Sequence, residues 1–268
     1  MIETKNSYAS AKSMIISAPI PEQTRTYKPV SHKELIDLTL ESIHQAGFEL
    51  DTESYSSARE GNVANGRFTI KNVADKEMKL EVGWQNSYDR SLSLKFAIGT
   101  RIIICQNGCV AGEYGAFKKK HRGNIQEFTP SAITEYIKGA GDVFKRMQDE
   151  REKMKQIEIT MKTKAELIGR MMIEESIIQS TQLNIIAQEL KAPTHDYGAP
   201  DSLWELYNHT TFAMKEIHPS LWMNQHIKAH NFFVNSSGLL VTEDITPVPA
   251  IVIPDSPFTQ LNIFNELG

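Results

Sequence analysis

The sequence predicts an α+β fold: an antiparallel β-meander with a flanking helix, followed by a largely helical region and an extended C-terminal tail. Between about residues 50 and 117, apolar residues alternate with polar ones, which is the period of strands with one buried face. On either side of that stretch, apolar residues recur every three or four positions, as in amphipathic helices. The chain has 268 residues, 40% of them hydrophobic, which suffices for a core without disulfides.

We expect four segments along the chain. Residues 1–30 are polar and contain prolines, which predicts a weakly ordered lead-in. Residues 31–128 should hold a helix and the antiparallel sheet, and residues 129–241 a helical region packed on that sheet. Residues 242–268 form a proline-rich tail that is expected to be extended and to carry a short linear motif.

Two helical regions are predicted on either side of the sheet. The first begins after Ser31, an N-cap with Glu34 three residues later, and ends at Gly47. The second starts beyond Pro130 and contains four apolar residues spaced by seven, at Met147, Met154, Met161 and Ile168. Charged residues interrupt this seam, so we expect a helical hairpin against the sheet rather than a free coiled coil.

The strands are predicted in the runs RFTIKN, EMKLEVGW, SLSLKFAIG and RIIIC, with NSYDRS and the Gly99-Thr100 step as turns. Asn107-Gly108 favours a two-residue hairpin turn after the last of these runs. In that register Cys105 and Cys109 point to opposite faces of the ribbon. We therefore expect two buried small side chains rather than a disulfide or a metal site.

Charge and hydropathy restrict the classes of partner. The chain has 33 acidic and 29 basic residues, a net charge of −4, so any binding to nucleic acid or anionic lipid would need a local basic patch. No run reaches the roughly 18 apolar residues of a membrane span, and the N-terminal residues lack the apolar core of a signal peptide. We expect a protein of a reducing cytoplasm with no membrane partner.

The sharpest local chemistry is a basic run that follows the predicted hairpin. Cationic side chains beside aromatic rings and glycines are typical of a groove for single-stranded nucleic acid, in which cations contact phosphates and rings stack on bases. The residues expected to do so are Tyr114, Phe117, Lys118, Lys119, Lys120 and Arg122. The alternative is a solvated turn, because short basic runs are common at loop tips.

Late histidines raise a different possibility, a metal-dependent enzyme. They are His209, His218, His226 and His230. The last two are four residues apart on a predicted helix, but Ile227 stands where a zinc protease has its glutamate, so we favour core or surface histidines. Phosphate-binding loops, nucleophile elbows and nucleotide-binding glycine patterns are missing from the sequence. We assign no catalytic residue, metal or cofactor and lean towards a non-enzymatic protein.

Two motifs resemble those of a known family. The run NSYDRSLSLKFAIGTRIIICQNGCVAGE is similar to the central signature of the phage/plasmid-like protein family of unknown function, and SLWELYNHTTFAMK is similar to its late motif. The matching positions are Ser87, Asp89, Arg101, Cys105, Asn107, Gly108, Trp204, Tyr207, Asn208 and Thr210. The resemblance implies a gene of phage, prophage or plasmid origin and the cytoplasm of a bacterial host. It supplies no activity, although the order of helix, meander and long helix is also that of single-strand-annealing recombinases.

The C-terminal residues TQLNIFNELG contain a second resemblance. Gln260, Leu261, Ile263 and Phe264 look like the short peptide by which bacterial replication proteins bind the sliding clamp. The three apolar side chains would fill a pocket, Gln260 would hydrogen-bond at its rim, and the preceding prolines would reduce the cost of ordering. A near-copy at residues 181–190 lies in a predicted helix, where its apolar side should pack on the core. Alternatively, the tail docks on the protein's own surface.

The leading hypothesis is a phage-derived, non-enzymatic accessory of DNA metabolism that binds or anneals single-stranded DNA and is recruited to the sliding clamp. One alternative is an anti-defence or host-takeover protein that acts by binding a host protein. A second is the metal-dependent enzyme. Homo-oligomerisation is left open by the sequence.

Overall fold

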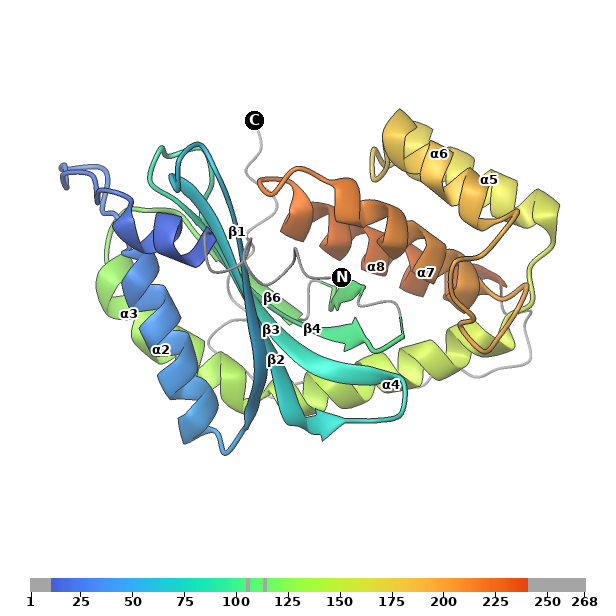
Figure 1. Ribbon diagram of the computed structural model, residues 1–268, viewed down its shortest axis with the longest axis horizontal. Coiled ribbons are helices and arrows are strands. Elements are labelled where there is room, and N and C mark those ends of the chain that lie inside the picture. Colours follow the sequence, from blue (N-terminus) through green and yellow to red (C-terminus); the bar gives the residue numbers. More distant parts are fainter. Residues whose placement is uncertain (1–10, 105–106, 113–114, 241–268) are drawn as a thin grey trace.

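The computed structural model describes residues 11–104, 107–112 and 115–240, with only the backbone described at 126–129 (Figure 1). The predicted α+β fold is confirmed: consecutive strands form an antiparallel sheet, helices flank it, and a helical region follows. The strands are β1 Leu50–Ala58, β2 Val63–Ala74, β3 Met78–Ser87, β4 Leu94–Ile102, β5 Gly108–Val110 and β6 Ala116–Lys119. The labelled helices are α2 His32–Gln45, α3 Ile125–Lys138, α4 Ala140–Gln156, α5 Met161–Ile173, α6 Ser180–Glu189, α7 Leu203–Ala213 and α8 Trp222–Leu240.

The sheet has the order β1-β2-β3-β4, and β4 then pairs with both β5 and β6 along its outer edge. The predicted turn at Gly99-Thr100 is wrong, because β4 runs through it as one strand. Gly99 is needed for a different reason: a Cβ there would collide with the carbonyl oxygen of Cys109 on β5. The glycine therefore permits the close approach of a neighbouring strand rather than a reversal of the chain.

The hairpin between β4 and β5 is also wider than the predicted two-residue turn. The Ile102 N–H donates to the Asn107 carbonyl over 2.8 Å, and Arg101 pairs with Gly108. Cys109 therefore lies opposite Thr100 and is buried, as expected for a small core side chain. Cys105 lies outside the described residues.

The two faces of the sheet differ in polarity. Alternate residues of β3 and β4, such as Leu80, Trp84 and Phe96, form an apolar face that packs in the main core with helices α2, α3 and α4. The opposite face carries polar side chains, and the first turn of α8 covers part of it, with Met223 packed on Ala97 of β4. Figure 1 shows α7 and α8 on the other side of the curved sheet from α2 and α3.

Residues 11–18 and 27–30 of the lead-in pack against the body of the protein, whereas we expected a weakly ordered segment. Residues 11–17 are helical, and Ile15 is buried. Further on, Tyr27 and Val30 are buried, and the Lys28 N–H donates to the His121 carbonyl over 2.9 Å. Between these two contacts, residues 19–26 are exposed or half-buried and run along the surface.

The helical region agrees with the prediction in outline. The Ser31 hydroxyl caps α2 by accepting from the Glu34 N–H. Helix α3 begins at Ile125, before the proline that we took as its boundary. The seven-residue seam is buried at Met147 and Met154 of α4 and at Ile168 of α5, but it is interrupted by Met161, which is 59% exposed at the start of α5. None of the helices in the described segments is apolar over a stretch long enough to cross a bilayer.

Candidate nucleic-acid interface

The basic run lies partly on β6 and partly on the turn that leads to α3. Lys118 is half-buried and pairs in register with Lys95 of β4, on the polar face of the sheet. Lys119 is opposite Leu94, on the apolar side. Lys120 and Arg122 are exposed in the turn. Strand geometry therefore divides the run, since Lys118 and Lys119 face opposite sides of the sheet.

Phe117 does not occupy the position that we expected for a ring that stacks on bases. Its side chain is 8% exposed and stacks on Phe96, with ring centroids 5.7 Å apart. It also meets the edge of Tyr136 at 5.2 Å. Because these contacts use both the face and the rim of the ring, Phe117 belongs to the core. Tyr114, the other predicted ring, lies outside the described residues.

His121 is a buried member of the run rather than an additional surface cation. Its Nε2 lies 2.6 Å from Oδ1 of Asn86, and burial lowers the pKa of the imidazole. The neutral ring also lies beside Tyr27, with centroids 5.6 Å apart. His121 thus anchors the turn, while the residues on either side of it reach solvent.

Asn86 is the buried side chain to which these segments attach. Its Nδ2 donates to the Val30 carbonyl over 2.8 Å and lies 3.1 Å from Nδ1 of His32. Burial, with a smaller contribution from His121, lowers the pKa of His32 to about 4. The lead-in, the start of α2 and the turn after β6 are therefore held together by neutral groups. Sequence analysis missed Asn86, because its partners are distant in the chain and no local pattern marks it.

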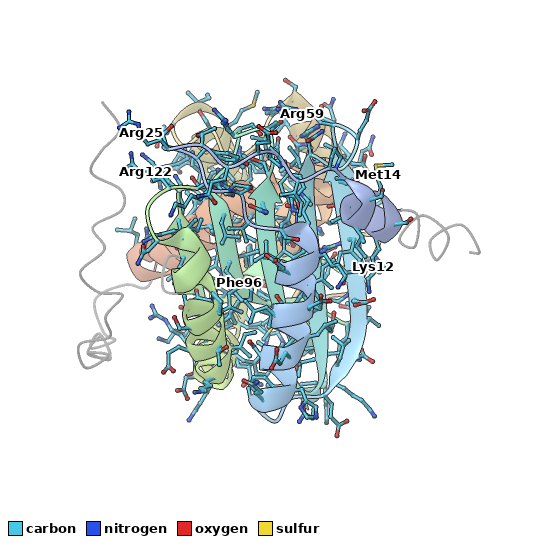
Figure 2. All side chains as sticks on the ribbon, turned by 90° about the vertical axis from the view of Figure 1, so that its left-hand side faces the viewer. Lys12, Met14, Arg25, Arg59, Phe96 and Arg122 are labelled. Atoms are coloured by element: carbon cyan, nitrogen blue, oxygen red, sulfur yellow. The ribbon has the colours of Figure 1, made fainter. Side chains whose placement is uncertain are left out.

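Basic residues from separate segments lie at the end of the sheet where Asn86 joins the lead-in to the turn after β6. We call them the basic end: Arg25, Lys28, Arg90, Lys118, Lys120 and Arg122. Figure 2 shows Arg25 and Arg122 at the same end of the sheet. The backbone bond between Lys28 and His121 joins two of the segments, and the Arg90 guanidinium lies 4.5 Å from the centre of the Tyr27 ring. The sequence showed only the run on β6 and its turn; the fold adds the other cations to it.

The basic end carries uncompensated positive charge. Among the described residues, none of its six members forms an ion pair with a carboxylate. The nearest acidic residue in sequence to Arg90 is Asp89, which is bound to Arg59. Burial raises the pKa of Asp89, but hydrogen bonds from Ser91 and the Arg59 guanidinium together lower it to about 2. The Asp89 carboxylate is thus ionised and paired with Arg59, so it does not form an ion pair with any of the six cations of the basic end.

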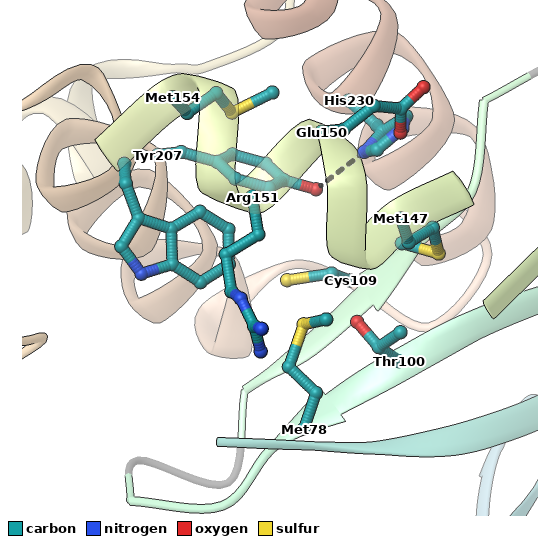
Figure 3. A pocket seen from close by; sticks show the side chains of 10 residues that line it. Met78, Thr100, Cys109, Met147, Glu150, Arg151, Met154, Tyr207 and His230 are labelled. Atoms are coloured by element: carbon teal, nitrogen blue, oxygen red, sulfur yellow. Dashed lines mark hydrogen bonds and ion pairs between the residues drawn. The ribbon is translucent and has the colours of Figure 1, made fainter. Parts of the chain in front are cut away.

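A second polar constellation is buried between α4, α7 and α8 (Figure 3). The Tyr207 hydroxyl lies 3.1 Å from Nδ1 of His230, and Nε2 of that ring lies 3.0 Å from a Glu150 oxygen. Arg146 donates to the other oxygen over 3.1 Å. The adjoining cavity, which Cys109 also lines, measures about 10 Å³, the size of a single water. This network is suited to holding three helices together, since it offers no room for a substrate.

The late histidines do not converge. His226 lies beside Trp222, and burial together with Arg67 lowers the pKa of its ring to about 3, whereas His230 faces Glu150. His209 is buried near Glu189, and His218 bonds the Ser220 hydroxyl. Within the residues that the structure describes, no three histidines, cysteines or carboxylates are grouped so that they could bind a metal ion.

The predicted tail residues Gln260, Leu261, Ile263 and Phe264 lie outside the described residues. The near-copy of their motif forms α6, in which Gln182 and Ile186 are buried, as expected for a helix whose apolar side packs on the core.

Comparison with known proteins adds one finding. Neither the curated proteins nor the solved structures contain a match to this chain. A family profile matches residues 22–226, which include the whole sheet, the basic end and the start of α8. The chain therefore belongs to the family described as Domain of unknown function (DUF932).

Proposed function

We propose that the protein is a non-enzymatic accessory of DNA metabolism, of phage, prophage or plasmid origin, that binds or anneals single-stranded DNA. The observation that supports this proposal is the basic end, in which cations from three segments lie without carboxylate partners among the described residues. A protein with a net charge of −4 has no general attraction for polyanions, so a local cluster of this kind is required.

The binding that we propose depends mainly on phosphate contacts. Each phosphate neutralised on a single strand contributes about 0.7 to the slope of log affinity against log salt, so six contacts would give a slope of about 4. Because Phe117 lies in the core, base stacking falls to Tyr114 in this proposal. Phosphate contacts carry little sequence information, and we therefore expect weak base preference.

We further propose that Gln260, Leu261, Ile263 and Phe264 bind the bacterial sliding clamp and bring the protein to replicating DNA. The support is the sequence of this peptide and its place behind a proline-rich segment. Removing all residues after Pro257 should abolish clamp binding in a pull-down or surface-binding assay and leave DNA binding intact. Clamp binding that survives the truncation would contradict this part of the proposal.

The DNA-binding part is tested with a labelled single-stranded oligonucleotide at several salt concentrations. The variant Arg25→Ala/Lys120→Ala/Arg122→Ala removes three exposed cations and should reduce the salt slope by about 2. A double variant, Lys162→Ala/Lys191→Ala, removes exposed lysines next to the α5–α6 region and should leave the slope unchanged.

The outcomes separate the proposal from its alternatives. Equal slopes for the wild-type protein and the triple variant, or no binding by either, would contradict a DNA-binding role for the basic end. In that case the anti-defence or host-takeover hypothesis would take its place, and capture of a host protein that is insensitive to the same substitutions would support it. The metal-dependent enzyme predicts stoichiometric metal in the purified protein that is lost with His226→Ala or His230→Ala.

A further inference from the structure

A cleft opens on the polar face of the sheet, at the opposite end of β4 from the basic end. Its volume is about 180 Å³. The described residues that line it are Asp51, Thr52, Thr69, Lys79, Arg101 and Ile103. Arg101 is one of the positions on which the family resemblance rests. It lies six residues along β4 from Lys95, about 20 Å at the rise of a strand. The cleft is thus separate from the basic end.

Arg101 has hydrogen-bonding capacity that the described residues do not use. Its Nη1 donates to the hydroxyls of Thr52 and Thr69, both over a long 3.3 Å. In the described parts of the chain, no carboxylate lies within ion-pair distance of this guanidinium. A half-buried guanidinium held by two neutral hydroxyls loses hydration without gaining an opposite charge. An anion in the cleft would supply that charge.

The two other charged residues that line the cleft balance each other. Lys79 and Asp51 form an ion pair of 2.7 Å at its margin, where both side chains are about one-third exposed. Glu81, the buried carboxylate on the same face, accepts a long bond of 3.4 Å from the Thr69 hydroxyl. Arg67, the next arginine on this face, stacks on Trp222. Among the described residues, no carboxylate within 4 Å neutralises the charge of Arg101 at the cleft.

We propose that this Arg101 cleft binds an oxyanion of the phosphate class. A guanidinium presents parallel N–H groups that match two oxygens of a phosphate, and it does so more specifically than an ammonium. The Thr52 hydroxyl and the Lys79 ammonium lie where they can add further donors. This volume is more than ten times that of the single-water cavity beside Glu150, so the cleft admits a phosphate group with part of its hydration shell. The source is either a free phosphate or the backbone of a nucleic acid.

The direct test follows the side-chain Nε–H signal of Arg101 by NMR in the full chain. Inorganic phosphate should shift this signal saturably, whereas sodium chloride at equal ionic strength should not. The phosphate affinity of the variants is measured by isothermal titration calorimetry, since Arg101→Lys removes the reporting side chain. Arg101→Lys should weaken phosphate binding about tenfold or more, because it removes the paired donors. Arg67→Lys makes the same chemical change on the same face, outside the cleft lining, and should leave the affinity unchanged.

A single-stranded oligonucleotide forms the second arm of the test. If phosphate and the oligonucleotide both shift the signal, the cleft accepts the phosphate group from either source. If only the oligonucleotide does, and Arg101→Lys weakens it while Arg67→Lys does not, the source is the nucleic-acid backbone. A signal that neither ligand shifts, or that chloride shifts equally, would overturn the proposal. The signal of the wild-type protein decides whether the cleft binds phosphate even if a variant is unstable. The result does not depend on the salt-slope test of the basic end, so the two proposals can fail separately.

Discussion

At the scale of single residues, Asn86 connects three segments of the chain. It has no exposed surface and contacts the Val30 carbonyl, His32 and His121 at once. Asn86→Ala would leave two ring nitrogens and a carbonyl without their partner in a buried site. At about 1–3 kcal/mol for each buried group left unsatisfied, and with some relaxation, we expect a loss of about 3 kcal/mol in the free energy of unfolding. Urea denaturation measures it.

A matched control is Asn72→Ala. Asn72 makes the same kind of bonds, accepting from the Glu49 N–H and donating to the Gly47 carbonyl, but it is exposed. Water can replace its partners, so we expect a loss below about 1 kcal/mol. Equal losses for the two variants would show that Asn86 does not act as a buried connection.

The same residues show where sequence reasoning succeeds and fails at this scale. The basic run is visible in the sequence, and Lys120 and Arg122 are exposed as expected. The roles of Phe117 and His121 are not visible, because they depend on the strand β6 and on a partner 35 residues earlier. The function of a run of basic residues can be predicted only when it is known which side of the sheet each side chain occupies.

At the scale of elements, the packing of β3 against β2 requires a glycine at position 66. Gly66 pairs with Trp84, and a Cβ on Gly66 would lie 2.6 Å from the indole ring, which is fully buried. Gly66→Ala must displace the ring or separate the strands, so we expect a loss of about 1–3 kcal/mol or more in the free energy of unfolding. A melting temperature equal to that of the wild-type protein would contradict this packing.

The opposite result is expected for a glycine in a helix. Gly169 lies within α5, and nothing lies within 4 Å of the position of its Cβ. Alanine there restricts the unfolded chain and introduces no clash, so Gly169→Ala should raise the free energy of unfolding by about 0.5–1 kcal/mol. Urea denaturation beside Gly66→Ala tests both predictions, and a destabilised Gly169→Ala would show that α5 packs more closely than the structure describes.

Elements with local signals were the predictable ones. The capping residue Ser31 marks the start of α2, and alternation marks β3 and the first part of β4. The turn at Gly99-Thr100 was wrongly predicted, because a glycine that admits a neighbouring strand looks the same in sequence as a glycine that turns the chain.

At the scale of the whole molecule, the sheet is buried on both faces by parts of the chain that are far apart. The Pro219 carbonyl, before α8, accepts hydrogen bonds from Asn65 and Gln85 on the polar face, the latter across 134 residues. Such contacts have no local signature, so the cover of this face could not be predicted from the sequence. The Arg101 cleft is likewise assembled from four strands and Ile103, whose pairing the sequence alone does not give.

The folded protein also holds several buried histidines in neutral form, which makes stability depend on pH. Burial lowers the pKa of His32 to about 4, and burial together with Arg67 lowers that of His226 to about 3; burial also lowers those of His121 and His209. In the unfolded chain these rings titrate near 6.5. As the pH falls below that value, the unfolded state takes up protons that the folded state does not, so the free energy of unfolding must decrease.

The free energy of unfolding should decrease between about pH 6.5 and about pH 4. Each of these rings adds up to about 1.4 kcal/mol per pH unit to the slope of the free energy of unfolding against pH. Asp89, whose pKa is lowered to about 2, contributes to acid sensitivity chiefly at the lower end of this pH range and below it. Urea denaturation at a series of pH values measures the slope, and His226→Gln should reduce it by the share of one ring. A free energy of unfolding that stays constant between about pH 7 and 5 would mean that these rings are solvated or paired in the folded protein, and the burial of these histidines would then have to be abandoned.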